Sequence, residues 1–127
     1  MELHAAPESE NRPGHYSMGV SCGGFAFISG QLPIDWRGTG KLVCGGIEKQ
    51  AEQALNNLVS ALNEIGLTIN DVIKTTVLIA GAENWPVVDG IYGRFFGAHR
   101  PARTIIPTTS LHYGALIEIE AIARERS

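Results

Sequence analysis

The spacing of apolar residues changes along the chain and separates helix-like from strand-like segments. Between positions 47 and 65 apolar residues recur every three or four positions, which is the period of one helix face. The segment from Trp85 to Phe96 has the same period, with Pro86 in its first turn and Gly97 directly after it. The pattern therefore predicts two amphipathic helices. The stripe of the first consists of Ile47, Ala51, Ala54, Leu55, Leu58, Ala61, Leu62 and Ile65.

Shorter runs rich in β-branched and aromatic residues predict strands. The first two runs flank the pair Gly23-Gly24, which is a hairpin signal. The predicted order is β-β-α-β-α-β-β, an α+β fold with a mixed sheet. Right-handed crossovers place both helices on the same face of that sheet, so the other face has no cover and we expect it to bind further copies. The strand-like runs are 17–22, 25–29, 72–80, 103–108 and 116–124.

Length and composition indicate one folded domain. The chain has 127 residues, of which 44% are hydrophobic, as is typical of a globular protein. Residues 1–14 are polar and contain two prolines, so we expect an N-terminal arm there and a single domain over 15–127. The start of the chain lacks the basic and apolar regions of a signal peptide, and no membrane span is evident, so we expect a cytoplasmic protein.

Charge and metal-binding residues exclude several classes of function. The net charge is −3 and the chain has no run of Lys or Arg, which argues against nucleic-acid binding. Cys22 and Cys44 do not form a Cys-x-x-Cys pair, and the four histidines lack the spacing of metal ligands. We therefore expect no metal site.

Arg103 and a glutamate are the strongest candidates for chemistry. Arg103 begins a strand among small and apolar residues, and its planar guanidinium suits a carboxylate ligand. Glu118 and Glu120 alternate with isoleucines and share one strand face with Ile122. A half-buried carboxylate there would have the raised pKa that proton transfer requires. Two other interpretations stay open. Arg103 could be a surface residue in an ion pair, and the two glutamates could lie on a solvated sheet face.

The end of the second strand and two tyrosines add further candidates. Ser29 could hold a water or a substrate group, and Gly30 would let a ligand approach the backbone. Tyr16 and Tyr113 could cover a ligand and form hydrogen bonds to it. More commonly, a tyrosine in such a place is a half-buried packing residue.

Several segments, in order along nearly the whole chain, resemble the RidA/YjgF family of enamine/imine deaminases. The resemblance implies a chorismate-mutase-like fold and a homotrimer with active sites in the clefts between subunits. It also implies hydrolysis of 2-aminoacrylate-type enamines and their imines to 2-keto acids and ammonia, without a metal or organic cofactor. The segments are Gly14–Ser17, Phe27–Pro33, Gln50–Gly66, Asn70–Val77, Ile91–Gly97, Pro101–Thr104 and Ile117–Ala123.

The same resemblance assigns roles to individual residues. Arg103 would bind the substrate carboxylate, and Glu118 would handle the proton and position the attacking water. Ser29 and Gly30 would line the pocket, and Tyr16 would pack over the ligand at its mouth.

The chain departs from the family pattern at several positions around the implied pocket. Ile105 stands where many members have cysteine, Asp89 replaces a common asparagine, and His15 replaces proline. His112 lies in a segment, Ser110–Tyr113, that replaces the usual Arg-Leu-Pro. These changes put the substrate in question. The alternatives are an aminomuconate-type deaminase, a non-catalytic binder of small carboxylates, and an endoribonuclease, against which the net charge argues.

Overall fold

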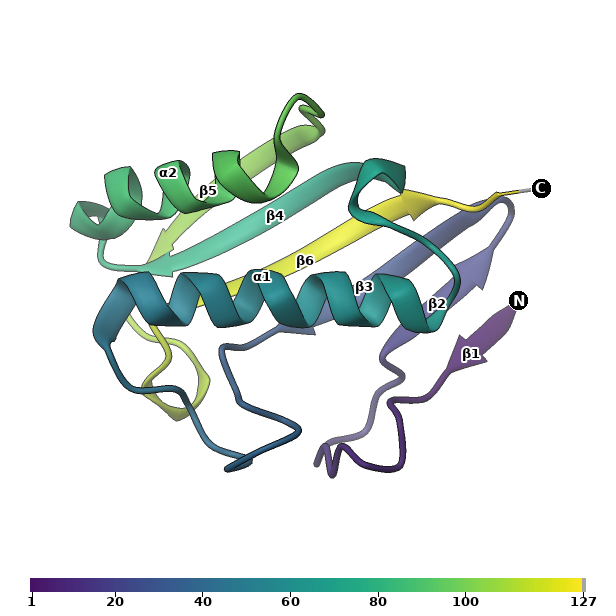
Figure 1. The fold of residues 1–127 in the computed structure, drawn as a ribbon, viewed down its shortest axis with the longest axis horizontal. Helices are drawn as coiled ribbons and strands as arrows, with labels where there is room; N and C mark the ends of the chain where they lie inside the picture. The colour runs from purple at the N-terminus through teal and green to yellow at the C-terminus, as the bar shows by residue number, and fades with distance from the viewer. Residues whose placement is uncertain (127) are drawn as a thin grey trace.

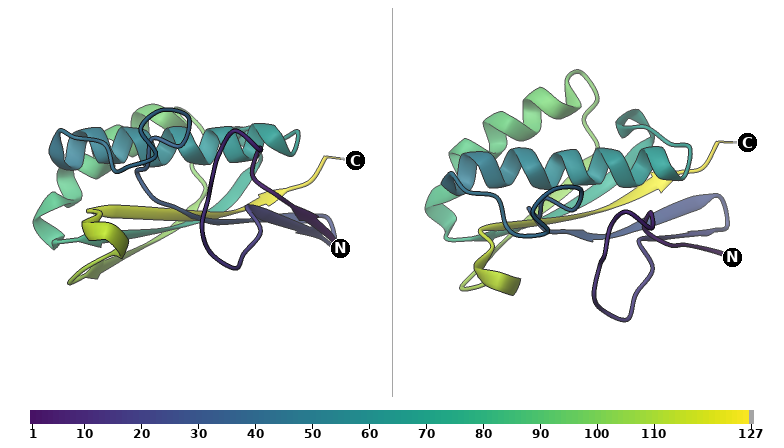
Figure 2. Two further views of the ribbon diagram at one scale, coloured as in Figure 1. Left: turned by 90° about the horizontal axis from the view of Figure 1, so that it is seen from below. Right: turned by 60° about the horizontal axis from the view of Figure 1, so that its bottom comes forward.

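A six-stranded sheet carries two helices on one of its faces (Figures 1 and 2). The computed structural model describes residues 1–126, and the strand order is β1-β2-β3-β6-β4-β5. The strands are β1 (Glu2–His4), β2 (Gly19–Cys22), β3 (Phe25–Gln31), β4 (Val72–Ala80), β5 (Ala102–Thr108) and β6 (Ile117–Arg124). The helices are α1 (Gly46–Glu64) and α2 (Trp85–Phe96), with short 3₁₀ turns η1 (Ile69–Asp71), η2 (Ala82–Asn84) and η3 (His112–Gly114).

The predicted elements form with small shifts at their ends, which confirms the α+β fold and its mixed sheet. β2 and β3 make the expected hairpin, in which Cys22 pairs with Phe25 across Gly23-Gly24. Both glycines have positive φ, which matches the twist of a two-residue hairpin turn. β4 and β5 are parallel, and every other neighbouring pair is antiparallel.

The core lies between the two helices and the helix-facing side of the sheet. α1 buries its apolar stripe against β3 and β6, and α2 packs beside α1. α1 ends where predicted, because the amides of Gly66 and Leu67 bond back to the carbonyls of Asn63 and Leu62. On β6, Ile117 and Ile119 point into this core.

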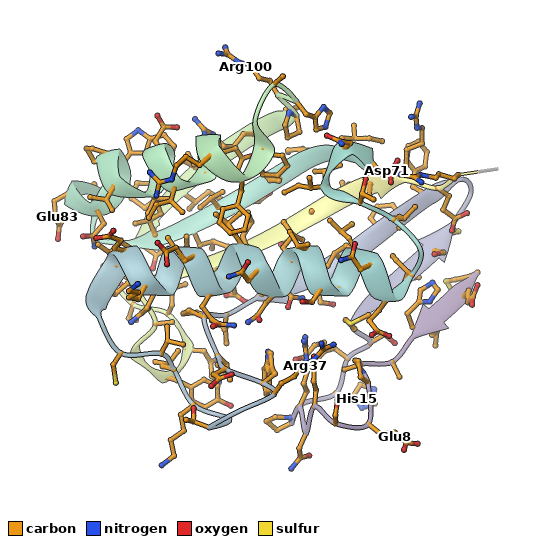
Figure 3. The ribbon with its side chains drawn as sticks, viewed as in Figure 1. Glu8, His15, Arg37, Asp71, Glu83 and Arg100 are labelled. Atoms are coloured by element: carbon orange, nitrogen blue, oxygen red, sulfur yellow. The ribbon has the colours of Figure 1, made fainter. Side chains whose placement is uncertain are left out.

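The N-terminal arm is more closely integrated than the sequence suggests. Residues 2–4 pair with β2 as an edge strand, β1, which the polar sequence Glu-Leu-His did not predict. Further along the arm, the side chain of Glu10 is only 4% exposed and accepts hydrogen bonds from Arg12 and Arg37. Figure 3 shows Arg37 beside the arm. The buried pair of Glu10 with Arg12 lies within the arm, and the pair of Glu10 with the more exposed Arg37 links the arm to the loop before α1.

The second face of the sheet has no helix on it (Figure 2). Leu3, Phe27 and Ile106 project from this face, and 44% of Phe27 is exposed. The side-chain alternation predicted from the sequence is confirmed, but association of copies through this face remains a prediction. No helix within residues 1–126 has an apolar stretch long enough to cross a bilayer.

Candidate active site

A cavity of about 650 Å³ opens where the end of the uncovered sheet face meets the arm and two loops. Its size is that of a small-molecule site. The sheet contributes the ends of β3 and β6, while the arm, the 32–36 segment and η3 form the walls. The lining residues are Pro13, Gly14, Tyr16, Ser29, Gly30, Leu32, Ile34, Trp36, His112, Tyr113, Glu118 and Glu120.

Glu118 is the half-buried carboxylate of this cavity. On β6, Glu118 lies on one face of the strand and the buried Ile117 and Ile119 lie on the other, as the alternation predicted. Burial raises the pKa of Glu118; nearby His112 works against this increase, and the charge of Glu120 adds to it. A carboxyl group with a raised pKa can both accept and return a proton near neutral pH.

Gly30 makes room for that carboxylate. A Cβ at position 30 would overlap with Oε2 and the carboxyl carbon of Glu118, so a larger residue there would push the carboxylate out of its present position. The register of β3 against β6 shifts between Ile28 and Gln31, which marks an irregularity of the strand at this point.

Ser29 and Tyr16 border the same cavity. The Ser29 hydroxyl donates to the carbonyl of Ser17 at 2.7 Å, and the Gln31 side-chain amide donates to the Ser29 carbonyl at 2.8 Å. Tyr16 is half exposed at the rim. The structure thus brings Tyr16, Ser29, Gly30 and Glu118 together, as the family resemblance implied.

Arg103 lies in a second cluster, against α2. Its guanidinium donates to Asp89 at 3.0 Å and lies between two rings, 4.5 Å from the centroid of Trp85 and 4.8 Å from that of Tyr92. The Tyr92 hydroxyl bonds to Thr75 at 2.8 Å, and burial raises the pKa of this tyrosine. Arg103 is therefore held from three sides but is not fully enclosed.

Arg103 and Glu118 point to opposite faces of the sheet. The rings that hold Arg103 belong to α2, which lies on the helix-covered face, whereas Glu118 alternates with the isoleucines that point toward the helices. Asp89 accompanies Arg103, and Ile105 lies in a separate apolar hollow with Trp85 and Ile79. One chain therefore does not bring Arg103 and Glu118 into one cavity.

Trp36 is a wall residue that the sequence analysis missed. The Arg12 guanidinium lies 4.7 Å from the Trp36 ring centroid, and the Arg12 side chain also donates to Gln31 at 3.2 Å. A tryptophan in a glycine-rich loop was the available signal, because large apolar side chains are uncommon in solvated loops.

His112 and Tyr113 complete the wall from η3. Their rings contact edge to face, with centroids 4.7 Å apart. Tyr113 has a φ of 59°, a conformation that residues other than glycine rarely adopt. His15 is exposed on the arm, and Cys22 and Cys44 are exposed without a disulfide. Among residues 1–126, no three His, Cys, Asp or Glu side chains gather as a metal site requires.

Comparison with known proteins identifies the family. Residues 6–125 match the family model described as Endoribonuclease L-PSP. A RutC family protein of Pyrococcus horikoshii is 41% identical over 91% of this chain and 93% of its own. The 2-iminobutanoate/2-iminopropanoate deaminase of Homo sapiens is 39% identical over 87% of this chain and 80% of its own.

Solved structures agree in fold over the whole chain. A structure described as a putative endoribonuclease from Thermotoga maritima has a TM-score of 0.91 and 38% identity, with both chains fully covered. The YjgF gene product of E. coli has a TM-score of 0.89 and 32% identity, covering 99% of this chain and 100% of its own. The chain therefore belongs to the RidA/YjgF family, whose family model bears the name Endoribonuclease L-PSP.

Proposed function

We propose that this protein hydrolyses imino acids and their enamine tautomers to 2-keto acids and ammonia. The observation that carries the proposal is Glu118, a half-buried carboxyl group with a raised pKa, facing a cavity lined by Ser29, Gly30 and Tyr16. Relatives named 2-iminobutanoate/2-iminopropanoate deaminase at about 40% identity support it.

The chemistry requires little more than one group that moves protons. An iminium carbon is already electrophilic, so the enzyme must orient a water and take one of its protons. Water adds to the carbon while the Glu118 carboxylate accepts a proton, giving a carbinolamine. Glu118 then returns that proton to the nitrogen, the C–N bond breaks, and the hydroxyl proton leaves with ammonia as ammonium. The keto acid is released and Glu118 is again ionised.

Arg103 supplies the carboxylate clamp in this proposal, but from a second copy of the chain. Its charge lies on the helix-covered face, whereas Glu118 lies on the other face. A site that uses both must form where two copies meet, which fits the homotrimer that the family resemblance implies. In that assembly one copy provides Arg103 and its neighbour provides Glu118.

The charges around the cavity favour this reaction over two alternatives. Among its lining residues there is no Lys or Arg, and two carboxylates face it. Arg103 of a neighbouring copy would balance the single carboxylate of an imino acid. The second carboxylate of an aminomuconate-type substrate, or an RNA backbone, would face Glu118 and Glu120 with no further cation. A non-catalytic carboxylate binder is a second candidate, since a related E. coli protein, TdcF, was solved with bound serine at a TM-score of 0.89 and 29% identity.

A coupled assay tests the proposal. An L-amino-acid oxidase generates the imino acid in place, and semicarbazide captures whatever imine the protein has not hydrolysed. We expect the protein to accelerate keto-acid formation, and Arg103→Ala to reduce kcat/KM by about tenfold to a hundredfold, the value of a charge-assisted contact. Folded protein that binds keto acids but gives no acceleration with any imine would instead support the non-catalytic binder.

A further inference from the structure

The lining of the cavity around Glu118 bears on the side chain of the substrate. The cavity of one chain measures about 650 Å³ and is open to solvent, and a neighbouring copy that brings Arg103 to Glu118 would occupy part of it. The chemistry of the lining residues, and not the volume, therefore indicates which substrate side chain fits.

The lining divides into a polar side and an apolar side. The polar side consists of Ser29, Glu118 and Glu120 on β3 and β6, together with His112 and Tyr113 on η3. The apolar side comes from the segment after β3 and from the arm: Leu32, Ile34, Trp36, Pro13 and the ring of Tyr16. Apolar walls with a few placed polar groups are the usual design of a small-molecule pocket.

Trp36 is held in place rather than free to move. The Arg12 guanidinium covers its ring, and the side chain of Arg12 is only 7% exposed. Arg12 is itself bound by the buried carboxylate of Glu10, at 2.9 Å from Nε, and donates to Gln31 at the end of β3. Trp36 therefore forms a preformed wall, which lowers the entropic cost of receiving an apolar group.

We infer that the substrate of this site has a large apolar or aromatic side chain, as the imino acids derived from phenylalanine and leucine have, and that Trp36 forms the wall that receives it. The inference rests on the proposed deaminase function. Acidic side chains are disfavoured, because Glu118 and Glu120 border the cavity without a lining Lys or Arg. Small side chains would bury too little apolar surface to use the wall.

The experiment compares kcat/KM for imino acids generated from phenylalanine, leucine, alanine and glutamate. We expect the phenylalanine-derived substrate to exceed the alanine-derived one by about tenfold or more, since single methylene groups in an apolar pocket already discriminate about tenfold. The glutamate-derived substrate should be the poorest. Equal rates, or a preference for the alanine-derived imine, would overturn the inference and leave the deaminase proposal standing.

Variants of the wall sharpen the test. Trp36→Ala should lower the phenylalanine-to-alanine ratio toward one, whereas Trp36→Phe should keep most of it. Arg12→Met should lower the ratio part of the way. Arg37→Met is its matched control, because Arg37 also binds Glu10 whereas Arg12 is the residue that lies over the Trp36 ring. An unchanged ratio in folded Trp36→Ala would remove Trp36 from the site.

A binding measurement separates this inference from catalysis. Phenylpyruvate should raise the melting temperature of the wild-type protein more than pyruvate does at equal concentration, and Trp36→Ala should lose that difference. If the protein hydrolyses no imine but keeps this preference, the inferred preference for large apolar side chains is supported and the deaminase proposal fails. If pyruvate stabilises as strongly as phenylpyruvate, the inference fails.

Discussion

The two faces of the sheet provide different environments for Arg103 and Glu118. On the helix-covered face, Arg103 is balanced by Asp89 and sandwiched between Trp85 and Tyr92. On the uncovered face, Glu118 has no ion-pair partner among residues 1–126; burial and the nearby charge of Glu120 raise its pKa. In the proposed function, the rigidly held arginine binds an anion and the glutamate changes its protonation state.

In the proposed function, substrate binding and proton transfer are carried out by two different copies of the chain. A binding group benefits from rigid support, whereas a proton-transfer group needs a pKa near the working pH. One protomer contains both groups but separates them by the thickness of the sheet. Each of the following experiments tests one side of this comparison.

The largest effect is expected at Glu118. Glu118→Gln keeps the shape of the side chain but cannot take a proton from water, so kcat should fall about 100-fold or more. Steady-state kinetics with the phenylalanine-derived imine, alongside circular dichroism to verify folding, make the measurement. A kcat within a few-fold of wild type would show that proton transfer uses another group.

Mixing two impaired variants tests whether neighbouring copies share a site. Chains with Arg103→Ala and chains with Glu118→Gln, unfolded and refolded together in equal amounts, should regain about a quarter of wild-type activity, because that share of randomly assembled interfaces has both native residues. Each variant refolded alone is the control. Absence of recovery in assemblies that contain both chains would mean that the two residues do not act across an interface.

Substitution of Asp89 should have a smaller effect, on the KM for the substrate that Arg103 is proposed to bind. The carboxylate of Asp89 binds the Arg103 guanidinium, for which the substrate carboxylate would compete, and the pair is partly exposed. Exposed pairs contribute about 0.2–1 kcal/mol, so Asp89→Asn should lower KM by up to about fivefold with little change in kcat. A higher KM would indicate that Asp89 orients Arg103 for the substrate rather than competing with it.

The smallest expected effect is the contribution of Glu118 to stability. Its pKa is raised above the usual 4.5 in the folded state, so the folded chain holds the proton more tightly than the unfolded chain. The favourable contribution is present below the usual pKa and is lost as the pH rises through the folded pKa. Urea unfolding should therefore show wild type losing stability relative to Glu118→Gln over this interval. Parallel stability curves would contradict the raised pKa.

The elements were predictable because their periodicity is strong. α1, β4 and α2 lie where the apolar spacing places them, and even the alternation of Glu118 with Ile117 is read correctly. β1 was missed, because its three residues carry no strand pattern and pair only when β2 is beside them.

The site was predictable in part, for a physical reason. Glu118, Ser29, Gly30 and Tyr16 converge as the family resemblance implied. The face on which Arg103 lies could not be derived from its own strand, since it depends on the parallel pairing of β5 with β4 and on the rings of α2. Trp36 was missed because its position depends on Arg12, 24 positions earlier in the chain.

The fit between Gly30 and Glu118 also gives a criterion for sorting relatives. Any side chain at position 30 would overlap with the Glu118 carboxyl group. A homologous sequence with alanine or a larger residue there must therefore displace its glutamate or have lost it. Position 30, which carries no functional group of its own, can therefore identify relatives in which the carboxylate at position 118 is placed differently.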